Sequence, residues 1–190
     1  MGARRRRRVV TAIVNSWPVR PRAGTAGPTF ADVAERELEP VYRYLTLLTG
    51  DRTLAEDLAG ETFERALRSW KRYDPRRGSP RTWLYRIARN AALDHLRADA
   101  RRRRREQTYA LREGEEAREP AAHEGLDPEL EAALRALRAG EREVLALRVV
   151  LDLDGAEAAA VLGISRTACS TRLSRALTKL EERMESDVLA

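Results

Sequence analysis

Apolar residues recur at helical spacing over most of the chain. A first run begins at Thr29, is broken by Pro40 and ends at Gly50, and a second run begins after Asp51 and continues to Trp70. Spacings of three and four residues place such positions on one side of a helix, so both runs are expected to be amphipathic helices. The first run carries the apolar residues Val33, Leu38, Val41, Tyr42, Leu45 and Leu48.

A third helix is predicted from Pro80 toward Ala100. Ser79 can cap the free N–H groups of its first turn, and Pro80 suits the first helical position. At about 100° per residue the helix has two faces. The face expected in the core carries Leu84, Ile87, Ala88, Ala91 and His95, and the face expected to be exposed carries Trp83, Arg86, Asn90, Asp94 and Arg97.

The exposed face and the residues before it suit nucleic acid. Arginines neutralise phosphates, Asn can hydrogen-bond a base edge, and an aromatic ring can stack on an unpaired base. Upstream lie Trp70, Lys71, Arg72 and Tyr73, then a basic loop, Asp74 to Ser79, that contains Arg76 and Arg77. The alternative interpretation is that the three aromatics are core residues and the arginines only form a solvated surface.

The C-terminal part has the pattern of a helix-turn-helix. Helices are expected over Glu129–Arg138, closed by Gly140, and over Glu141–Leu151. A helix over Ala156–Leu162, a turn at Gly163 and Ile164, and a last helix capped by Ser165 follow. Its apolar stripe would be Cys169, Leu173, Ala176, Leu177, Leu180 and Met184.

The first turns of the last helix are candidates for base contacts in the major groove. The candidates are Arg166, Thr167, Ser170, Thr171 and Arg175, with Arg172 expected on a phosphate. A plain helical hairpin with a hydroxyl-rich face is the alternative.

Composition narrows the chemistry. The 190 residues carry 36 Lys plus Arg against 30 Asp plus Glu, a net charge of +6 that favours a phosphate-bearing partner. One cysteine and two histidines allow neither an internal disulfide nor a standard structural zinc site. The sequence offers no phosphate-binding glycine loop, no nucleophile–base pair and no apolar run long enough to cross a membrane. We therefore expect a cytoplasmic protein that is not an enzyme, is not inserted in a membrane and needs no catalytic residue, metal or cofactor.

Breaks in periodicity divide the chain into four parts. Residues 1–28 are expected to be a disordered basic tail, and residues 29–105 a first helical domain. Residues 106–128 turn acidic and are interrupted by Gly and Pro, which predicts a flexible linker, and residues 129–190 form the second domain. The predicted fold is all-α, with two small helical domains joined by that linker.

The sequence resembles bacterial RNA polymerase sigma factors of the extracytoplasmic-function (ECF) group. The first domain carries the likeness in YRYLTLLTGDRTLAEDLAGETFERAL and WKRYDPRRGSPRTWLYRIARNAALDHLR, and the second in EREVLALRVVLDLDGAEAAAVLGISRTACSTRLSRAL. The resemblance implies that the first domain binds the polymerase clamp and melts DNA at the −10 element, and that the second reads the −35 element. It also implies an anti-sigma protein as a partner.

The resemblance assigns roles to individual positions. Clamp binding falls on Glu56, Asp57, Glu61 and Phe63. Recognition and melting of the −10 element fall on Trp70, Lys71, Tyr73, Arg76, Arg77, Trp83, Arg86, Asn90 and Arg97, with the loop 74–80 capturing a flipped base and Asn90 lining its pocket.

The chain departs from the family pattern at three places. Gly60 stands where the family often has Gln, which puts one polar contact in doubt. Asp154 to Ala158 stand where a hydroxyl cap and an Ile are more usual, and Ser170 where a Lys is common. These departures put the strength of the polymerase and −35 contacts in question.

The expected function is that of a sigma factor, which binds core RNA polymerase, directs it to the −10 and −35 elements of a promoter and assists DNA melting. The alternative is a helix-turn-helix regulator that does not act as a sigma subunit, which accounts for the second domain only. A basic RNA-binding or structural protein is a further alternative. The promoter sequence, the inducing signal, the anti-sigma partner and the role of the tail are not determined by the sequence.

Overall fold

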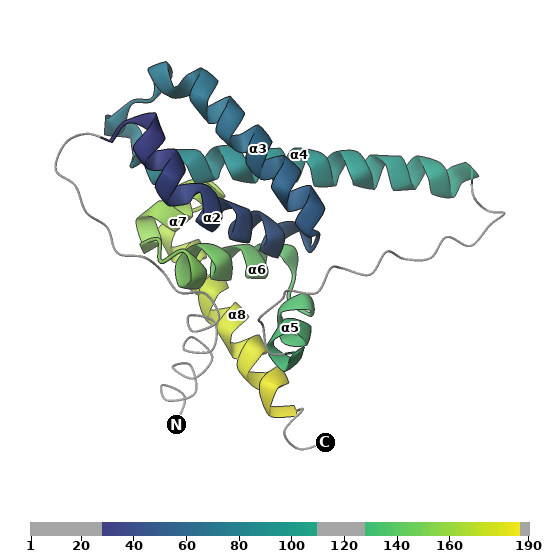
Figure 1. Ribbon diagram of the computed structural model, residues 1–190. Coiled ribbons are helices and arrows are strands. Elements are labelled where there is room, and N and C mark those ends of the chain that lie inside the picture. Colours follow the sequence, from purple (N-terminus) through teal and green to yellow (C-terminus); the bar gives the residue numbers. More distant parts are fainter. Residues whose placement is uncertain (1–27, 110–127, 187–190) are drawn as a thin grey trace.

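The computed structural model describes residues 28–109 and 128–186, and all regular elements within these two ranges are helical. Three helices of the first range pack above the helices of the second, and one long helix projects sideways (Figure 1). The all-α prediction is confirmed. The predicted tail lies almost wholly outside the described residues, as does most of the predicted linker.

The first helix, α2, spans Phe30–Thr49. Thr29 and Asp32 form a reciprocal capping box at its start, and Gly50 ends it in the left-handed conformation at φ 67°. The predicted break at Pro40 is wrong, because α2 runs through this proline without interruption. Leu38 was predicted to be part of the apolar stripe, but it is 57% exposed and lies outside the core.

Helix α3 spans Arg52–Ser69, and Asp51 caps it by accepting a hydrogen bond from the Leu54 N–H at 3.0 Å. Helices α2, α3 and α4 pack against one another and bury a common core. At its centre Tyr44 and Tyr85 meet edge to face with ring centroids 5.5 Å apart. The largest aliphatic side chains buried there are Val41, Leu45 and Leu84.

Helix α4 spans Pro80–Tyr109 and is longer than predicted, because Arg101 to Arg105 continue it. Ser79 caps it as predicted, since its Oγ accepts the Thr82 N–H at 3.1 Å. The predicted core position of His95 is wrong. Residues 94–98 are all exposed, and the end of α4 extends beyond α2 and α3 (Figure 1), so His95 has no core to pack against.

The second range begins with α5, Pro128–Arg135, and α6, Ala139–Leu145, which continues as the π-helical turn η3, Ala146–Val150. Gly140 does not close the first of these helices as predicted. It lies in the first turn of α6, and α5 ends before it at Arg135. The predicted apolar positions of this region, Leu130, Ala133, Leu134 and Leu137, are all buried.

Helices α7, Gly155–Leu162, and α8, Arg166–Ser186, form the predicted helix-turn-helix. Gly163 takes the left-handed conformation at φ 67°, which glycine adopts without the strain that a Cβ would cause. Ser165 caps α8 by accepting the Ala168 N–H at 3.1 Å. Cys169, Ala176, Leu177 and Leu180 are buried as the predicted stripe requires.

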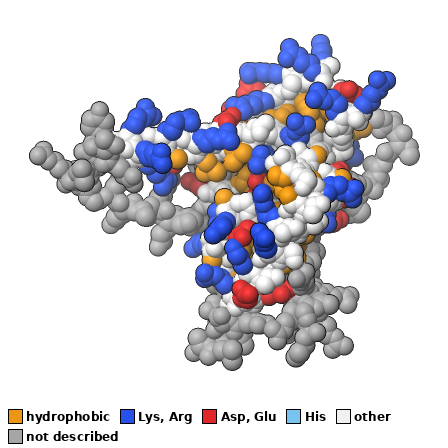
Figure 2. All heavy atoms as spheres, turned by 180° about the vertical axis from the view of Figure 1, so that it is seen from behind, with side chains coloured by type: hydrophobic (Ala, Val, Ile, Leu, Met, Phe, Trp, Pro, Cys, Tyr) orange, Lys and Arg blue, Asp and Glu red, His pale blue; other side chains and the backbone are white. Residues whose placement is uncertain are grey.

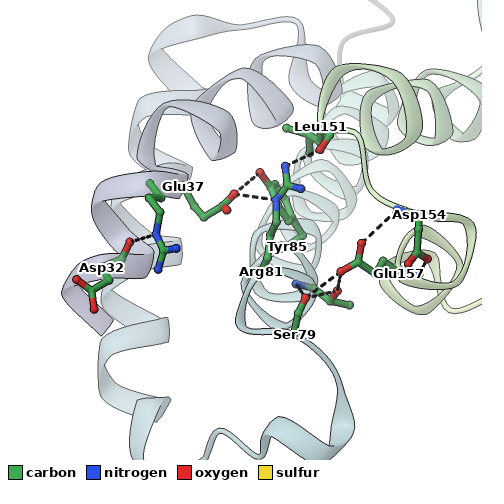
Figure 3. A network of polar contacts seen from close by, with 10 residues as sticks. Asp32, Glu37, Ser79, Arg81, Tyr85, Leu151, Asp154 and Glu157 are labelled. Atoms are coloured by element: carbon green, nitrogen blue, oxygen red, sulfur yellow. Dashed lines mark hydrogen bonds and ion pairs between the residues drawn. The ribbon is translucent and has the colours of Figure 1, made fainter. Parts of the chain in front are cut away.

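The two helical groups also contact each other. Helix α7 packs against α4, and α6 packs against α2. Polar groups bridge the contact (Figure 3): Arg81 binds the Glu37 carboxylate at 3.1 Å and the Leu151 carbonyl at 2.5 Å. Glu157 of α7 accepts the Ser79 hydroxyl at 3.1 Å. These bonds hold the first turn of α4 against the helix-turn-helix.

Candidate nucleic-acid interfaces

Four aromatic rings gather where α3 leads into α4. Tyr73 stacks on Trp70 with ring centroids 5.1 Å apart, and Trp83 meets Trp70 edge to face at 5.7 Å. Phe30, from the start of α2, meets Trp70 edge to face, with ring centroids 5.5 Å apart. Phe30, Trp70 and Trp83 pack against the core, and all four rings remain partly exposed. The aromatics therefore support the fold, and their role in binding nucleic acid stays a prediction.

The loop after these rings is fixed by local hydrogen bonds. The Asp74 carboxylate accepts the Arg76 N–H at 3.0 Å and caps the short turn η2, Pro75–Arg77. The Tyr73 hydroxyl donates to the Gly78 carbonyl at 2.8 Å, and Gly78 has φ 138°, a conformation that side chains rarely adopt. Burial, and then the nearby Asp74 charge, raise the pKa of Tyr73, so its hydroxyl stays protonated and can keep this bond.

The loop and α4 enclose a cavity of about 230 Å³. Pockets for drug-sized ligands begin at about 300 Å³, so this cavity suits only a small group. It is lined by the predicted residues Tyr73, Arg77, Trp83, Arg86 and Asn90. Arg72, Asp74, Gly78, Thr82 and Ile87 complete the lining.

The other residues predicted for this interface lie around the cavity. Trp70 supports the rings, Lys71 is exposed in the short helical turn Trp70–Arg72, and Arg76 is exposed on the loop. Arg97 lies two turns beyond Asn90 and pairs with Asp94 at 3.5 Å. Thr82 was missed because a buried threonine in a helix has no distinguishing pattern; it lines the cavity and also faces Glu157 of α7 at 3.4 Å.

The residues predicted for polymerase binding lie on α3. Glu56 and Asp57 are exposed, and Glu61 pairs with Arg65 one turn later at 2.5 Å. Phe63 is half-buried and packs on the core, so only part of its ring is available to a partner. Leu67 has the helical spacing of an apolar residue that faces the core, but its side chain is 59% exposed.

The residues predicted to read DNA lie along the first turns of α8. Arg166, Thr167, Ser170, Thr171 and Arg175 are all exposed. Arg172 is half-buried, and its guanidinium lies 3.3 Å from where a Cβ on Gly140 would stand. Cys169 is buried on the opposite face, and burial raises the pKa of its thiol. Within the described residues no cluster of side chains could hold a metal, and no helix could span a membrane.

Comparisons with known proteins agree with this arrangement. The model of Sigma-70 region 2 matches residues 33–102, and that of Sigma-70 region 4 matches residues 128–180. The RNA polymerase sigma factor CarQ of Myxococcus xanthus is 36% identical over 162 residues, which cover 83% of this chain and 90% of that protein. The ECF RNA polymerase sigma factor BldN of Streptomyces coelicolor is 33% identical over 173 residues, covering 88% of this chain but 64% of BldN.

A solved structure shows the same fold. The sigma factor RpoE of Bartonella quintana, in complex with the anti-sigma factor NepR, superposes with a TM-score of 0.65 at 25% identity, covering 83% of this chain and 98% of that one. The two family models match in the order of the two predicted domains, and the relatives match over most of this chain. Together these matches establish the family. This chain belongs to the RNA polymerase sigma factors, in the extracytoplasmic-function group.

Proposed function

We propose that this protein binds core RNA polymerase, directs it to promoters through −10 and −35 contacts, and assists strand opening at the −10 element. It acts in the cytoplasm, where it meets polymerase and promoter DNA, and it catalyses no reaction by itself. Its membership of the sigma family supports this assignment.

The observation that carries the proposal is the cavity between the loop 74–79 and α4. Opening DNA costs a few kcal/mol of stacking free energy per base step. A pocket that receives an unstacked base offsets part of that cost. Aromatic rings line this one beside the exposed Arg86 and Asn90. Trp83 and Tyr73 supply stacking surface, and the arginines supply charge for the phosphates.

Helix α8 supplies the second DNA contact in this proposal. Its exposed first turns present Arg166, Thr167 and Ser170 at the end of the helix that enters a major groove in a helix-turn-helix. Arginine at such a position can bind guanine with two hydrogen bonds, and hydroxyl groups can bind bases or phosphates.

The exposed acidic face of α3 is the proposed polymerase contact. Glu56 and Asp57 are exposed on this face, and Leu67, about three turns further along α3, adds an apolar side chain that is largely exposed. An apolar residue rimmed by charge is a common arrangement at protein interfaces. We also propose an anti-sigma protein as a partner, because RpoE, which shares this fold, was solved bound to one.

The decisive experiment combines association with transcription. Purified protein is mixed with core RNA polymerase, the complex is isolated, and run-off transcription is measured on genomic fragments. Transcripts that require the protein, with start sites preceded by shared −10 and −35 sequences, are expected. Specific DNA binding without any association with core polymerase would instead favour a helix-turn-helix regulator.

A further inference from the structure

The outward face of α3 changes from acidic to apolar along the helix. Glu56 and Asp57 are exposed near its start, and Leu67 in its last turn is 59% exposed. Between them, Glu61 and Glu64 pair with arginines one turn later in the same helix, each at 2.5 Å, so part of their charge is neutralised. Helices α2 and α4 pack against the other side of α3. The exposed face therefore presents carboxylates at one end and an apolar side chain at the other.

The N-terminal segment of the chain has the complementary order. Its sequence places five arginines, Arg4–Arg8, directly before the mainly apolar run Val9–Val14. Both runs lie outside the described residues, and neither has a role in the −10 and −35 contacts proposed above. Arginines bind carboxylates, and apolar side chains gain free energy by leaving water. A surface that suits this segment therefore combines acidic and apolar side chains.

The structure fixes where this segment joins the first domain. Phe30, the first residue of α2, contacts Trp70, the residue that follows α3, with ring centroids 5.5 Å apart (Figure 1). Leu67 lies about one turn before Trp70, so the apolar end of the α3 face is the end nearer this junction. The chain from Arg8 to the start of α2 can extend by about 70 Å, whereas Glu56 lies only about 21 Å along the helix from Trp70.

We propose that the N-terminal segment Arg4–Val14 docks on the exposed face of α3, with its arginines against Glu56 and Asp57 and its apolar run against Leu67. The segment then covers the proposed polymerase contact and restrains binding of the free protein until polymerase displaces it. This inference rests on that proposed contact. Because the segment is tethered to the domain that it binds, its effective concentration is of millimolar order, so a weak contact is enough to occupy the face.

DNA is the other class of partner for an arginine run. DNA phosphates bind arginines but offer no apolar surface to Val9–Val14, whereas α3 offers Leu67 beside the junction. On the face of the protein seen in Figure 2, Lys and Arg side chains prevail over Asp and Glu, so that face would repel the arginines. Charge and apolar order together favour α3.

The first test measures binding of the segment in trans by fluorescence anisotropy. A labelled peptide of residues 3–15 is titrated with a full-length variant in which Arg4–Arg8 are replaced with Gln, so that the tethered competitor is removed. The peptide should bind this variant, and adding Glu56→Gln/Asp57→Gln should weaken binding at least threefold, because both carboxylates are lost. The matched control, Glu35→Gln/Glu39→Gln, removes two exposed carboxylates from α2 and should leave the affinity unchanged.

Absence of peptide binding would overturn the inference, as would equal losses in the α3 variant and the α2 control. A second matched pair tests the apolar end of the face. Leu67→Ala should weaken peptide binding, whereas Leu38→Ala, at a leucine of α2 that is 57% exposed, should not.

The second test measures affinity for core RNA polymerase. The variant with Arg4–Arg8 replaced by Gln should bind core polymerase at least threefold more tightly than wild type at low salt. The difference should narrow as salt rises, because salt screens contacts between exposed charges. Equal affinity at all salt concentrations would overturn the inference.

Two further outcomes separate this inference from others. Unchanged affinity for core polymerase together with weaker promoter binding by the holoenzyme would assign the arginines to DNA and overturn the docking. Failure of both wild type and variant to bind core polymerase would overturn the proposed polymerase contact, while the peptide titration would still decide whether the segment docks on α3.

Discussion

Arg89 of α4 and Glu143 of α6 form an ion pair across the two domains, with Nε and Oε1 2.6 Å apart. The Glu143 side chain is only 7% exposed, and its carboxylate also accepts the Tyr44 hydroxyl at 3.1 Å. One buried carboxylate of the second domain is therefore held by two groups of the first. The domains must lose these bonds in order to separate and contact two distant promoter elements at once.

Removing the charge of Glu143 should allow the two domains to separate from each other. Glu143→Gln leaves Arg89 without its partner in a mostly buried position, and breaking a buried pair in this way costs about 3–5 kcal/mol. The radius of gyration from small-angle X-ray scattering should increase.

The matched control is Glu39→Gln, which breaks an ion pair with Arg43 inside α2 and touches no domain contact. Its radius of gyration should equal that of wild type. An unchanged radius for Glu143→Gln would show that the pair does not hold the domains together.

Replacing Arg86 and Asn90 with Ala should reduce promoter opening more than polymerase binding. Both side chains line the cavity and are exposed, and base contacts of this kind contribute about 1–3 kcal/mol each. Open-complex formation, measured by permanganate footprinting, should fall by roughly tenfold or more. Asp94→Ala, one turn further along the same face, is the control; equal loss of opening and polymerase binding would contradict the assignment.

A side chain at position 60 should fit on α3 and raise the stability of the protein. Nothing lies within 4 Å of a Cβ placed on Gly60, and Gly inside a helix costs about 0.8–1 kcal/mol relative to Ala. Gly60→Ala should therefore raise the free energy of unfolding by up to about 1 kcal/mol in urea denaturation.

Comparison with Gly60→Gln separates stability from polymerase binding. Gln is also a good helix former, so a gain in core polymerase affinity by Gly60→Gln over Gly60→Ala would identify a contact made by the amide. Identical affinity of the two variants would show that position 60 makes no such contact.

Stability should decline at alkaline pH. Burial, and then the Glu37 carboxylate, raise the pKa of Tyr85 well above its ordinary value, so the folded protein keeps a proton that the unfolded chain loses above about pH 10. The contribution is fully present below pH 10 and is lost as the pH rises further. Urea denaturation between pH 8 and 11 should show this fall, and Tyr85→Phe should show a shallower one; equal slopes would exclude Tyr85 as a cause.

The sequence determined the local structure of this protein. Helical periodicity, the caps Ser79 and Ser165, and the turn at Gly163 depend on residues within a few positions of one another, so the sequence alone predicts them. The same reasoning placed Tyr73, Trp83, Arg86 and Asn90 on one surface, because they belong to one helix and the loop before it.

Only the tertiary structure decided how the domains meet and where α4 stops being buried. Arg89 and Glu143 are separated by 54 residues and Tyr44 and Glu143 by 99, and no local pattern encodes pairing at that range. His95 has the period of a core residue but no helix beside it, and Pro40 is tolerated within α2. Periodicity shows which residues share a face, whereas burial depends on what that face packs against, which only the folded chain provides.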